Sequence, residues 1–194
     1  MKQDVLEPGV TYHIFNRGNN KEDIFKEEEN YFYFLKLIRT HLLPVCDIYA
    51  YCLLKNHFHL LLKIKEREEL FSAYHRKIHL PFSNFFNAYT KGINKKYNRT
   101  GSLFQENFKR KRVNDEKYLI QLIAYIHLNP VKHGFIEDHN DYKFSSFQAY
   151  TGTKPTNIKT GYVLSLINAE SFQHWHNERR LNTEYLGDFL QDQT

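Results

Sequence analysis

The chain has 194 residues, which is long enough for one hydrophobic core with an appendage and too short for two large domains. Lys and Arg number 27 against 22 Asp and Glu, so the formal net charge is +5 and the isoelectric point is near 9.0. This balance permits an acidic partner such as nucleic acid without requiring one, and no stretch is apolar for long enough to cross a bilayer.

The first part of the chain predicts a strand, a helix and a hairpin. Residues 10–15 are β-branched and aromatic and predict a strand that ends at a polar loop. Residues 27–41 have apolar side chains at helical spacing and an acidic first turn, and Pro44 closes this helix. Residues 47–54 and 57–64 predict two antiparallel strands joined by a tight two-residue turn.

The middle of the chain predicts a second helix and a basic strand. The helical pattern over residues 70–97 is broken at Pro81, so we expect a loop or short helix there, followed by a firmer helix over about residues 82–98. Residues 108–113 predict a short strand, and its cations suit the edge of a sheet.

A third helix and an aromatic segment follow. Asn114 is the expected cap of this helix, and Pro130 is expected to end it by restricting Asn129. Beyond the helix the sequence predicts an aromatic coil packed on the domain (142–150), a linker (151–161), and one or two helices (around 164–167 and 171–190).

The predicted order of elements specifies the fold class. Strand, helix, strand, strand, helix, strand is the order of an α+β, ferredoxin-like βαββαβ sheet, with strand 57–64 central and the basic strand at an edge. The helix after residue 114 is additional. We expect a catalytic domain over residues 1–150, and a linker and helical C-terminal extension over residues 151–194.

Two further features bear on the compartment. The first seven residues lack the apolar core of a signal peptide. Cys46 and Cys52 have neither zinc-site spacing nor a disulfide framework around them, which favours a reducing compartment. We therefore expect a cytoplasmic protein.

Two histidines in strand 57–64 are candidate metal ligands. Alternate side chains of a strand point to the same face, so His57 and His59 share one surface. The other face carries an apolar row of Phe58, Leu60, Leu62 and Ile64. Two imidazoles in this arrangement can hold a divalent cation if a third donor arrives from elsewhere. Taken alone, a His-x-His strand is more often structural than ligating.

The third helix offers that donor and a nucleophile. Its apolar stripe consists of Tyr118, Leu119, Leu122, Ile123 and Ile126. Tyr125 and Asn129 are expected at the margin of this stripe, one turn apart, while His127 and His133 are expected at the surface. An amide oxygen can bind Mg²⁺ or Mn²⁺, and a phenol beside the ion can attack phosphorus. The plainer reading is a packing tyrosine and a helix-terminating Asn-Pro pair.

Several motifs occur in the colinear order of a known family. They are Tyr12–Gly18, Asn56–His59 followed by leucines, Gly101–Gln105, Tyr125–Gly134 and Phe144–Phe147. Together, over roughly the first 150 positions, they resemble the HUH single-tyrosine transposases of the insertion-sequence 200-like group, which includes the REP-associated tyrosine transposases. The chain departs from the pattern at Lys55, where such proteins often have proline.

The resemblance implies a ferredoxin-like nuclease that cuts single-stranded DNA near hairpins and can rejoin it. By motif position, His57, His59 and Asn129 would hold Mg²⁺ or Mn²⁺. Tyr125 would be the nucleophile that takes the 5′ phosphate and leaves a 3′ hydroxyl. Some members of the family act as homodimers, and the length of the chain favours the REP-associated group.

Basic residues interleaved with aromatic ones are candidate DNA contacts. The candidates are Lys91, Lys95, Lys96, Arg99, Lys109, Arg110, Lys111 and Arg112, to which Arg17 is added from the loop after the first strand. Cations can track a nucleic-acid backbone while aromatic faces stack on unpaired bases. The plainer reading is a solvated helix and a protected edge strand.

Two other functions remain open at this point. One is a noncatalytic or domesticated nucleic-acid-binding protein with the same fold, although such a protein has no need of both histidines together with Tyr125 and Asn129. The other is a metal-dependent hydrolase that uses an activated water, for which Tyr125 would be dispensable.

Overall fold

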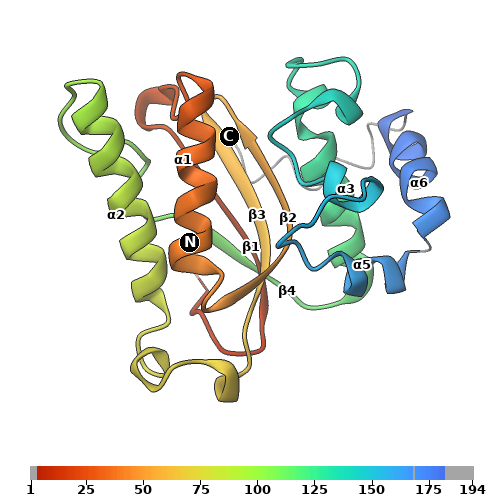
Figure 1. Ribbon diagram of the computed structural model, residues 1–194, viewed down its shortest axis with the longest axis horizontal. Helices are drawn as coiled ribbons and strands as arrows, with labels where there is room; N and C mark the ends of the chain where they lie inside the picture. The colour runs from red at the N-terminus through yellow and green to blue at the C-terminus, as the bar shows by residue number, and fades with distance from the viewer. Residues whose placement is uncertain (1–3, 168, 182–194) are drawn as a thin grey trace.

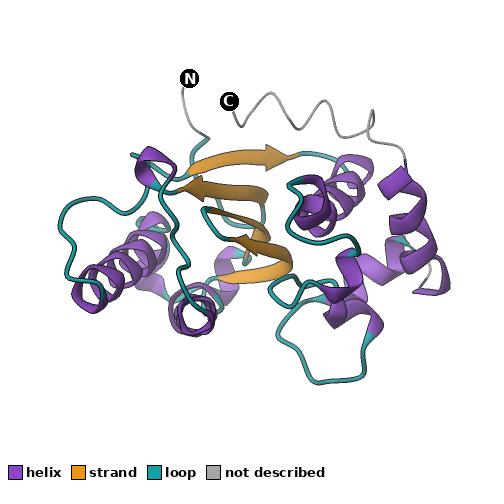
Figure 2. Ribbon diagram, turned by 90° about the horizontal axis from the view of Figure 1, so that it is seen from above, coloured by secondary structure: helices purple, strands orange, loops and turns teal. Residues whose placement is uncertain are grey.

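The computed structural model describes residues 4–167 and 169–181 and has a four-stranded antiparallel sheet with helices on both faces (Figures 1 and 2). The strands are β1 (Thr11–Arg17), β2 (Cys46–Leu54), β3 (His57–Ile64) and β4 (Lys109–Val113), and their order in the sheet is β2-β3-β1-β4. This confirms the α+β, ferredoxin-like prediction, with β3 in the interior and the basic strand at an edge. None of the helices within the described ranges is long and apolar enough to span a membrane.

Helices α1 (Glu28–Leu37) and α2 (His79–Lys96) cover one face of the sheet, as Figure 1 shows. The core between them and the sheet includes the apolar row of β3, from Phe58 to Ile64. Helix α2 starts earlier than expected, because Pro81 lies in its first turn, where a missing N–H leaves no helical hydrogen bond unmade.

Helix α3 (Glu116–Lys132) covers the opposite face and corrects two predictions. Its cap is Asp115, whose carboxylate accepts a hydrogen bond from the backbone N–H of Tyr118 at 2.7 Å, and not Asn114. Pro130 does not end the helix, which continues to Lys132 and then reaches Gly134 at a φ of +69°. Every residue from 122 to 130 is buried, so tertiary packing holds the last turn despite the proline.

The C-terminal segments bury the outer side of α3. They comprise α4 (Gln148–Thr151), α5 (Thr160–Leu166) and α6 (Ala169–Leu181), and the rest of the helix predicted over 171–190 lies outside the described residues. The prediction of a surface His127 is therefore wrong: its ring is fully buried and its nitrogens lie 2.8 Å from Ser146 Oγ and 3.0 Å from His176 Nε2. His133, beyond the covered part, is exposed as predicted. The division into domains at residue 150 stays a prediction.

The edge of β2 is covered by segments that return to it. The backbone N–H of Leu53 donates to the Phe144 carbonyl at 2.9 Å, and that of Ser146 donates to Tyr51 at the same distance. Further along, the N–H of Lys159 donates to the carbonyl of Ile48 at 2.9 Å. These bonds confirm that the aromatic coil packs back on the domain, and they occupy an edge that could otherwise pair with another chain.

We expect Phe172→Ala to destabilise the protein by about 3–5 kcal/mol. The Phe172 ring is 1% exposed and stacks on Tyr150 with a centroid distance of 4.5 Å, so truncation leaves a cavity beneath α6. Urea unfolding measures this loss. The control is Phe71→Ala, at a site 68% exposed, which should change stability by at most about 0.5 kcal/mol. Equal midpoints for the two variants would mean that α6 contributes nothing to the core.

Candidate active site

The two histidines lie at the start of β3, on the face that α3 covers. His57 is paired with Arg17 across the sheet and His59 with Phe15, so the register places both imidazoles on one surface, as predicted. Their ring centroids are 5.3 Å apart and their planes are perpendicular. His57 is 6% exposed and His59 is fully buried.

The ring nitrogens of His57 lie between two amide oxygens. Nδ1 is 2.7 Å from Asn56 Oδ1, and because an amide oxygen only accepts, Nδ1 carries the proton in this arrangement. Burial, and next the neighbouring His133, lower the pKa of His57 to about 4, so the ring is neutral at pH 7. Its lone pair on Nε2 then faces Asn129 Oδ1, another acceptor, at 3.4 Å.

Helix α3 fixes the orientation of the Asn129 amide. The side chain is fully buried, and Nδ2 donates to the backbone carbonyl of Tyr125, one turn earlier, at 3.4 Å. This bond turns Oδ1 toward His57. Two acceptors that face each other are stabilised by a cation between them, and two ligands about 2.1 Å from one ion at right-angled or tetrahedral positions are about 3.0–3.4 Å apart. The His57–Asn129 pair therefore fits a divalent ion.

His59 is oriented by His13. Its Nδ1 lies 2.9 Å from His13 Nε2, and burial lowers the pKa of both rings, that of His13 to about 3. A neutral imidazole held through one nitrogen by a second-layer partner is the form in which histidine binds metals. His13 thus orients His59. Within the described residues no group of three or more His, Cys, Asp or Glu side chains could hold a metal ion, so a metal site here would require a further donor such as the amide of Asn129.

Tyr125 lies against these rings and is 1% exposed. Its ring centroid is 5.5 Å from that of His59 and 6.4 Å from that of His13, both in edge-on geometry. The expectation that Tyr125 and Asn129 lie at the margin of the apolar stripe, on the border with solvent, is wrong, because both side chains are buried. The tyrosine and the candidate ligands come together within one chain.

Lys132 is a member of the site that the sequence analysis missed. Its Nζ lies 5.0 Å from the centroid of the Tyr125 ring. The sequence spacing could have identified it. Tyr125 and Lys132 are seven residues apart, and residues at that separation lie two turns apart on the same face of a helix.

The predicted DNA contacts separate into groups. Arg17, Lys109 and Lys111 lie on the α3 face of the sheet, because they are paired with His57, Phe15 and His13. The alternate residues of β4 point to the other face, where Arg112 pairs with Glu7 at 2.6 Å and Arg110 donates to the carbonyl of Asp4.

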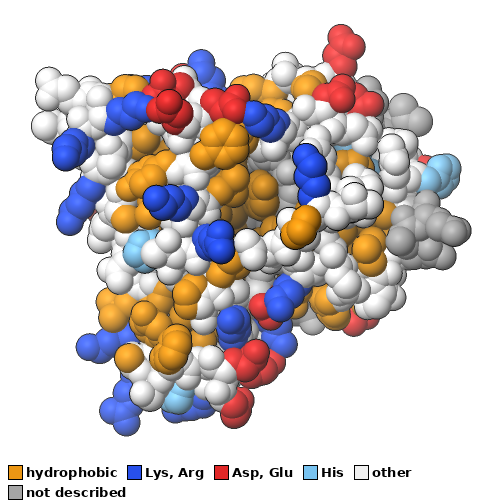
Figure 3. Space-filling model, viewed as in Figure 1, with side chains coloured by type: hydrophobic (Ala, Val, Ile, Leu, Met, Phe, Trp, Pro, Cys, Tyr) orange, Lys and Arg blue, Asp and Glu red, His pale blue; other side chains and the backbone are white. Residues whose placement is uncertain are grey.

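The remaining candidates belong to the α2 side. Lys96 pairs with Glu27 and Glu29, and Arg99 pairs with Glu22 at 2.8 Å. Lys91 and Lys95 are exposed on α2, across the sheet from α3. On the face shown in Figure 3, Lys and Arg side chains are scattered among acidic and apolar ones and do not form a single patch.

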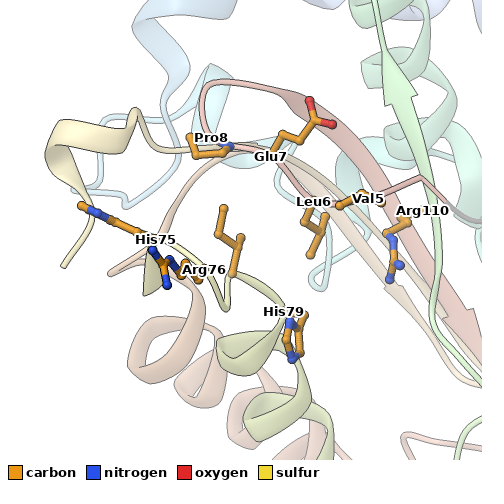
Figure 4. A pocket seen from close by; sticks show the side chains of 9 residues that line it. Val5, Leu6, Glu7, Pro8, His75, Arg76, His79 and Arg110 are labelled. Atoms are coloured by element: carbon orange, nitrogen blue, oxygen red, sulfur yellow. The ribbon is translucent and has the colours of Figure 1, made fainter. Parts of the chain in front are cut away.

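Arg110 also lines a pocket of about 380 Å³ that includes neither His57 nor His59 (Figure 4). The N-terminal segment from Val5 to Pro8 forms one wall, and His75, Arg76 and His79 come from the start of α2 and the loop before it. Apolar and cationic side chains mix there, without the paired acceptors found around His57.

Comparisons with known proteins bear on the family and the fold of the chain. A family model described as IS200-like transposase matches residues 8–129. A protein of Haemophilus influenzae, named as a REP-associated tyrosine transposase, is 32% identical over 101 residues, which are 50% of this chain and 57% of that protein. A solved structure of a REP-associated tyrosine transposase bound to a REP hairpin superimposes with a TM-score of 0.60 over 78% of this chain and 84% of the other. Its sequence identity is 19%, so it shows a shared fold.

Proposed function

The chain belongs to the family of IS200-like transposases, and from this membership we propose that it cuts and rejoins single-stranded DNA at hairpins through a covalent tyrosine intermediate. Hairpin DNA is proposed as the partner because a relative of the same fold is described as bound to a REP hairpin. The aligned stretch spans 57% of the Haemophilus relative. Assigning the activity of that whole protein to this chain is therefore also part of the proposal.

One observation carries the proposal. The neutral Nε2 of His57 and the Oδ1 of Asn129 face each other at 3.4 Å, and the ring of Tyr125 packs against His59 beside them. A noncatalytic binder has no use for two buried acceptors aimed at one point, because such a pair costs stability unless a proton or an ion lies between them.

His57, His59 and Asn129 would hold Mg²⁺ or Mn²⁺. The ion would polarise the phosphodiester and offset the charge that develops during its cleavage. All three ligands are neutral, so they would not reduce the positive charge that the ion presents to the phosphodiester. The metal and the role of each ligand are part of the proposal.

Tyr125 would carry out the cleavage step. Its Oη loses a proton and forms a bond to phosphorus, while the bond from phosphorus to the 3′ oxygen breaks and that oxygen gains a proton. The 5′ phosphate then stays on the tyrosine. Because one phosphoester replaces another, the reverse step rejoins DNA without a nucleotide cofactor.

The test uses end-labelled single strands that carry candidate hairpins. Incubation with Mg²⁺ or Mn²⁺ should give a labelled product that stays with the protein under denaturing conditions and is released by protease. Free cleaved DNA with no protein-linked product would favour an activated water over Tyr125.

We expect the two sides of β4 to contribute unequally to DNA binding. Replacing Lys109 and Lys111 by Gln should weaken hairpin binding and flatten its salt dependence by up to about two units of log–log slope, because each cation that meets a phosphate contributes about one unit. The matched control replaces Arg110 and Arg112 by Gln and should change the slope less, because these side chains engage Asp4 and Glu7. Equal slopes for the two double variants would refute a DNA-binding role specific to the α3 face.

Two further properties belong to the proposal. Cys46 and Cys52 are buried free thiols, in keeping with a cytoplasmic protein. Residues 1–150 would form the catalytic domain and 151–194 an extension, whose described residues 151–167 and 169–181 pack on it.

A further inference from the structure

The ammonium group of Lys132 is buried without a hydrogen-bond partner among the described residues. Nζ lies over the ring face of Tyr125, 5.0 Å from its centroid. A ring face attracts a cation, but it supplies none of the acceptors that three N–H groups require. A buried, uncompensated ammonium costs stability, so its presence calls for an explanation.

Among the described residues, no acid compensates the charge of Lys132. Burial alone lowers the pKa of Lys132 to about 8, with no carboxylate acting against it. The charged groups that act on His57 and His59 are Arg17 and Lys132, together with neighbouring histidines, and none is an acid. The metal ligands proposed above are neutral too, so no acid in the described part of the chain offsets the charge of Lys132, and a bound anion can do so.

The position of Lys132 on α3 indicates which anion its ammonium group binds. Tyr125, Asn129 and Lys132 follow at intervals of four and three residues, so they lie along one face of the helix. This face presents the proposed nucleophile, the amide ligand and the ammonium in that order. A group that reaches both the tyrosine oxygen and the ion would also come within reach of Nζ.

We propose that Lys132 is a catalytic residue whose ammonium binds a non-bridging oxygen of the phosphodiester that Tyr125 attacks, and then of the resulting phosphotyrosine. The inference rests on the proposed function. Lys132 keeps its protons throughout and acts as a hydrogen-bond donor and a fixed charge. Its effect is largest in the transition state, where the negative charge on the non-bridging oxygens has to be stabilised.

The first test measures single-turnover adduct formation by the full chain, with a labelled hairpin strand at saturating concentration. Lys132→Met should reduce the rate by about 10²–10³-fold, the usual effect of removing one charge-stabilising donor. Lys132→Arg should recover part of that loss. The control is Lys117→Met on the exposed side of α3, which should keep the parent rate. If the parent forms an adduct and Lys132→Met forms it equally fast, the role of Lys132 is refuted while the proposed function stands. If the parent forms none, the proposed function itself fails.

The second test asks whether the ammonium acts on the phosphate. A strand with a methylphosphonate at the cleavage position lacks the charged non-bridging oxygen. On this strand the parent should form the adduct only slightly faster than Lys132→Met, with the two rates differing by less than about tenfold. An undiminished difference between parent and variant on this strand would refute contact with that oxygen.

The third test separates this role from a structural one and needs no activity. Since the ammonium is buried without a partner, Lys132→Met should unfold at the same urea concentration as the parent or at a higher one. A lower midpoint together with slow adduct formation would make Lys132 a structural residue and overturn the proposal.

Discussion

Replacing Tyr125 by phenylalanine should abolish the covalent protein–DNA adduct while hairpin binding stays within a few-fold of the parent. The substitution removes one oxygen and retains the ring that packs against His59, at a site that is 1% exposed. The fold and the histidine geometry should therefore survive, and the bond to phosphorus should not form. Denaturing gels with end-labelled DNA measure the adduct, and titration of the same strand measures binding.

The matched control is Tyr118→Phe, two turns earlier on the same helix, which should leave the adduct at the parent level. An adduct of unchanged yield in Tyr125→Phe would show that the nucleophile is another residue. Cleavage without an adduct in both the parent and the variant would instead indicate an activated water.

Changing both His57 and His59 to Ala should remove cleavage, together with its dependence on Mg²⁺ or Mn²⁺. The two imidazoles are neutral because burial lowers the pKa of each, and neutral imidazole is the ligating form. Without them, Asn129 is the only proposed ligand left, which cannot hold a hydrated divalent ion at the phosphate. Cleavage of labelled hairpin strands, followed across a metal titration, measures the loss.

His133→Ala provides the comparison, since its ring lies 4.9 Å from that of His57 but is exposed at the end of α3. This variant should keep metal-dependent cleavage. The metal role is refuted if the parent protein cleaves equally well in EDTA, or if the double variant retains the metal response of the parent.

The sheet and its order could be read from the sequence because local patterns specify them. The apolar alternation of β3 places both histidines on one face, and the two-residue turn to β2 leaves little freedom in register. Periodicity could not show how completely α3 is buried, because Val163 and Phe172, which pack against it, are more than thirty residues away in the chain. For the same reason, His127 looked like a surface residue.

The roles of the individual Lys and Arg residues were also only partly predictable from the sequence. Their number favours nucleic acid, and the strand period separates Lys109 and Lys111 from Arg110 and Arg112, a distinction the sequence reading did not use. The ion pairs of Lys96 and Arg99 join residues about seventy positions apart, so composition gives no sign of them. Contacts between residues so far apart in the chain can be identified only from the folded structure.

The enclosure of α3 has a consequence for how two copies of the protein could cooperate. The helix is held between the sheet and the C-terminal segments, and Tyr125 sits in its buried middle. Exchanging tyrosines between subunits would expose the aromatic packing around Phe147 and Phe172 to water, at a large free-energy cost. Each copy would thus keep its own Tyr125, the proposed nucleophile, and two copies would form two separate sites.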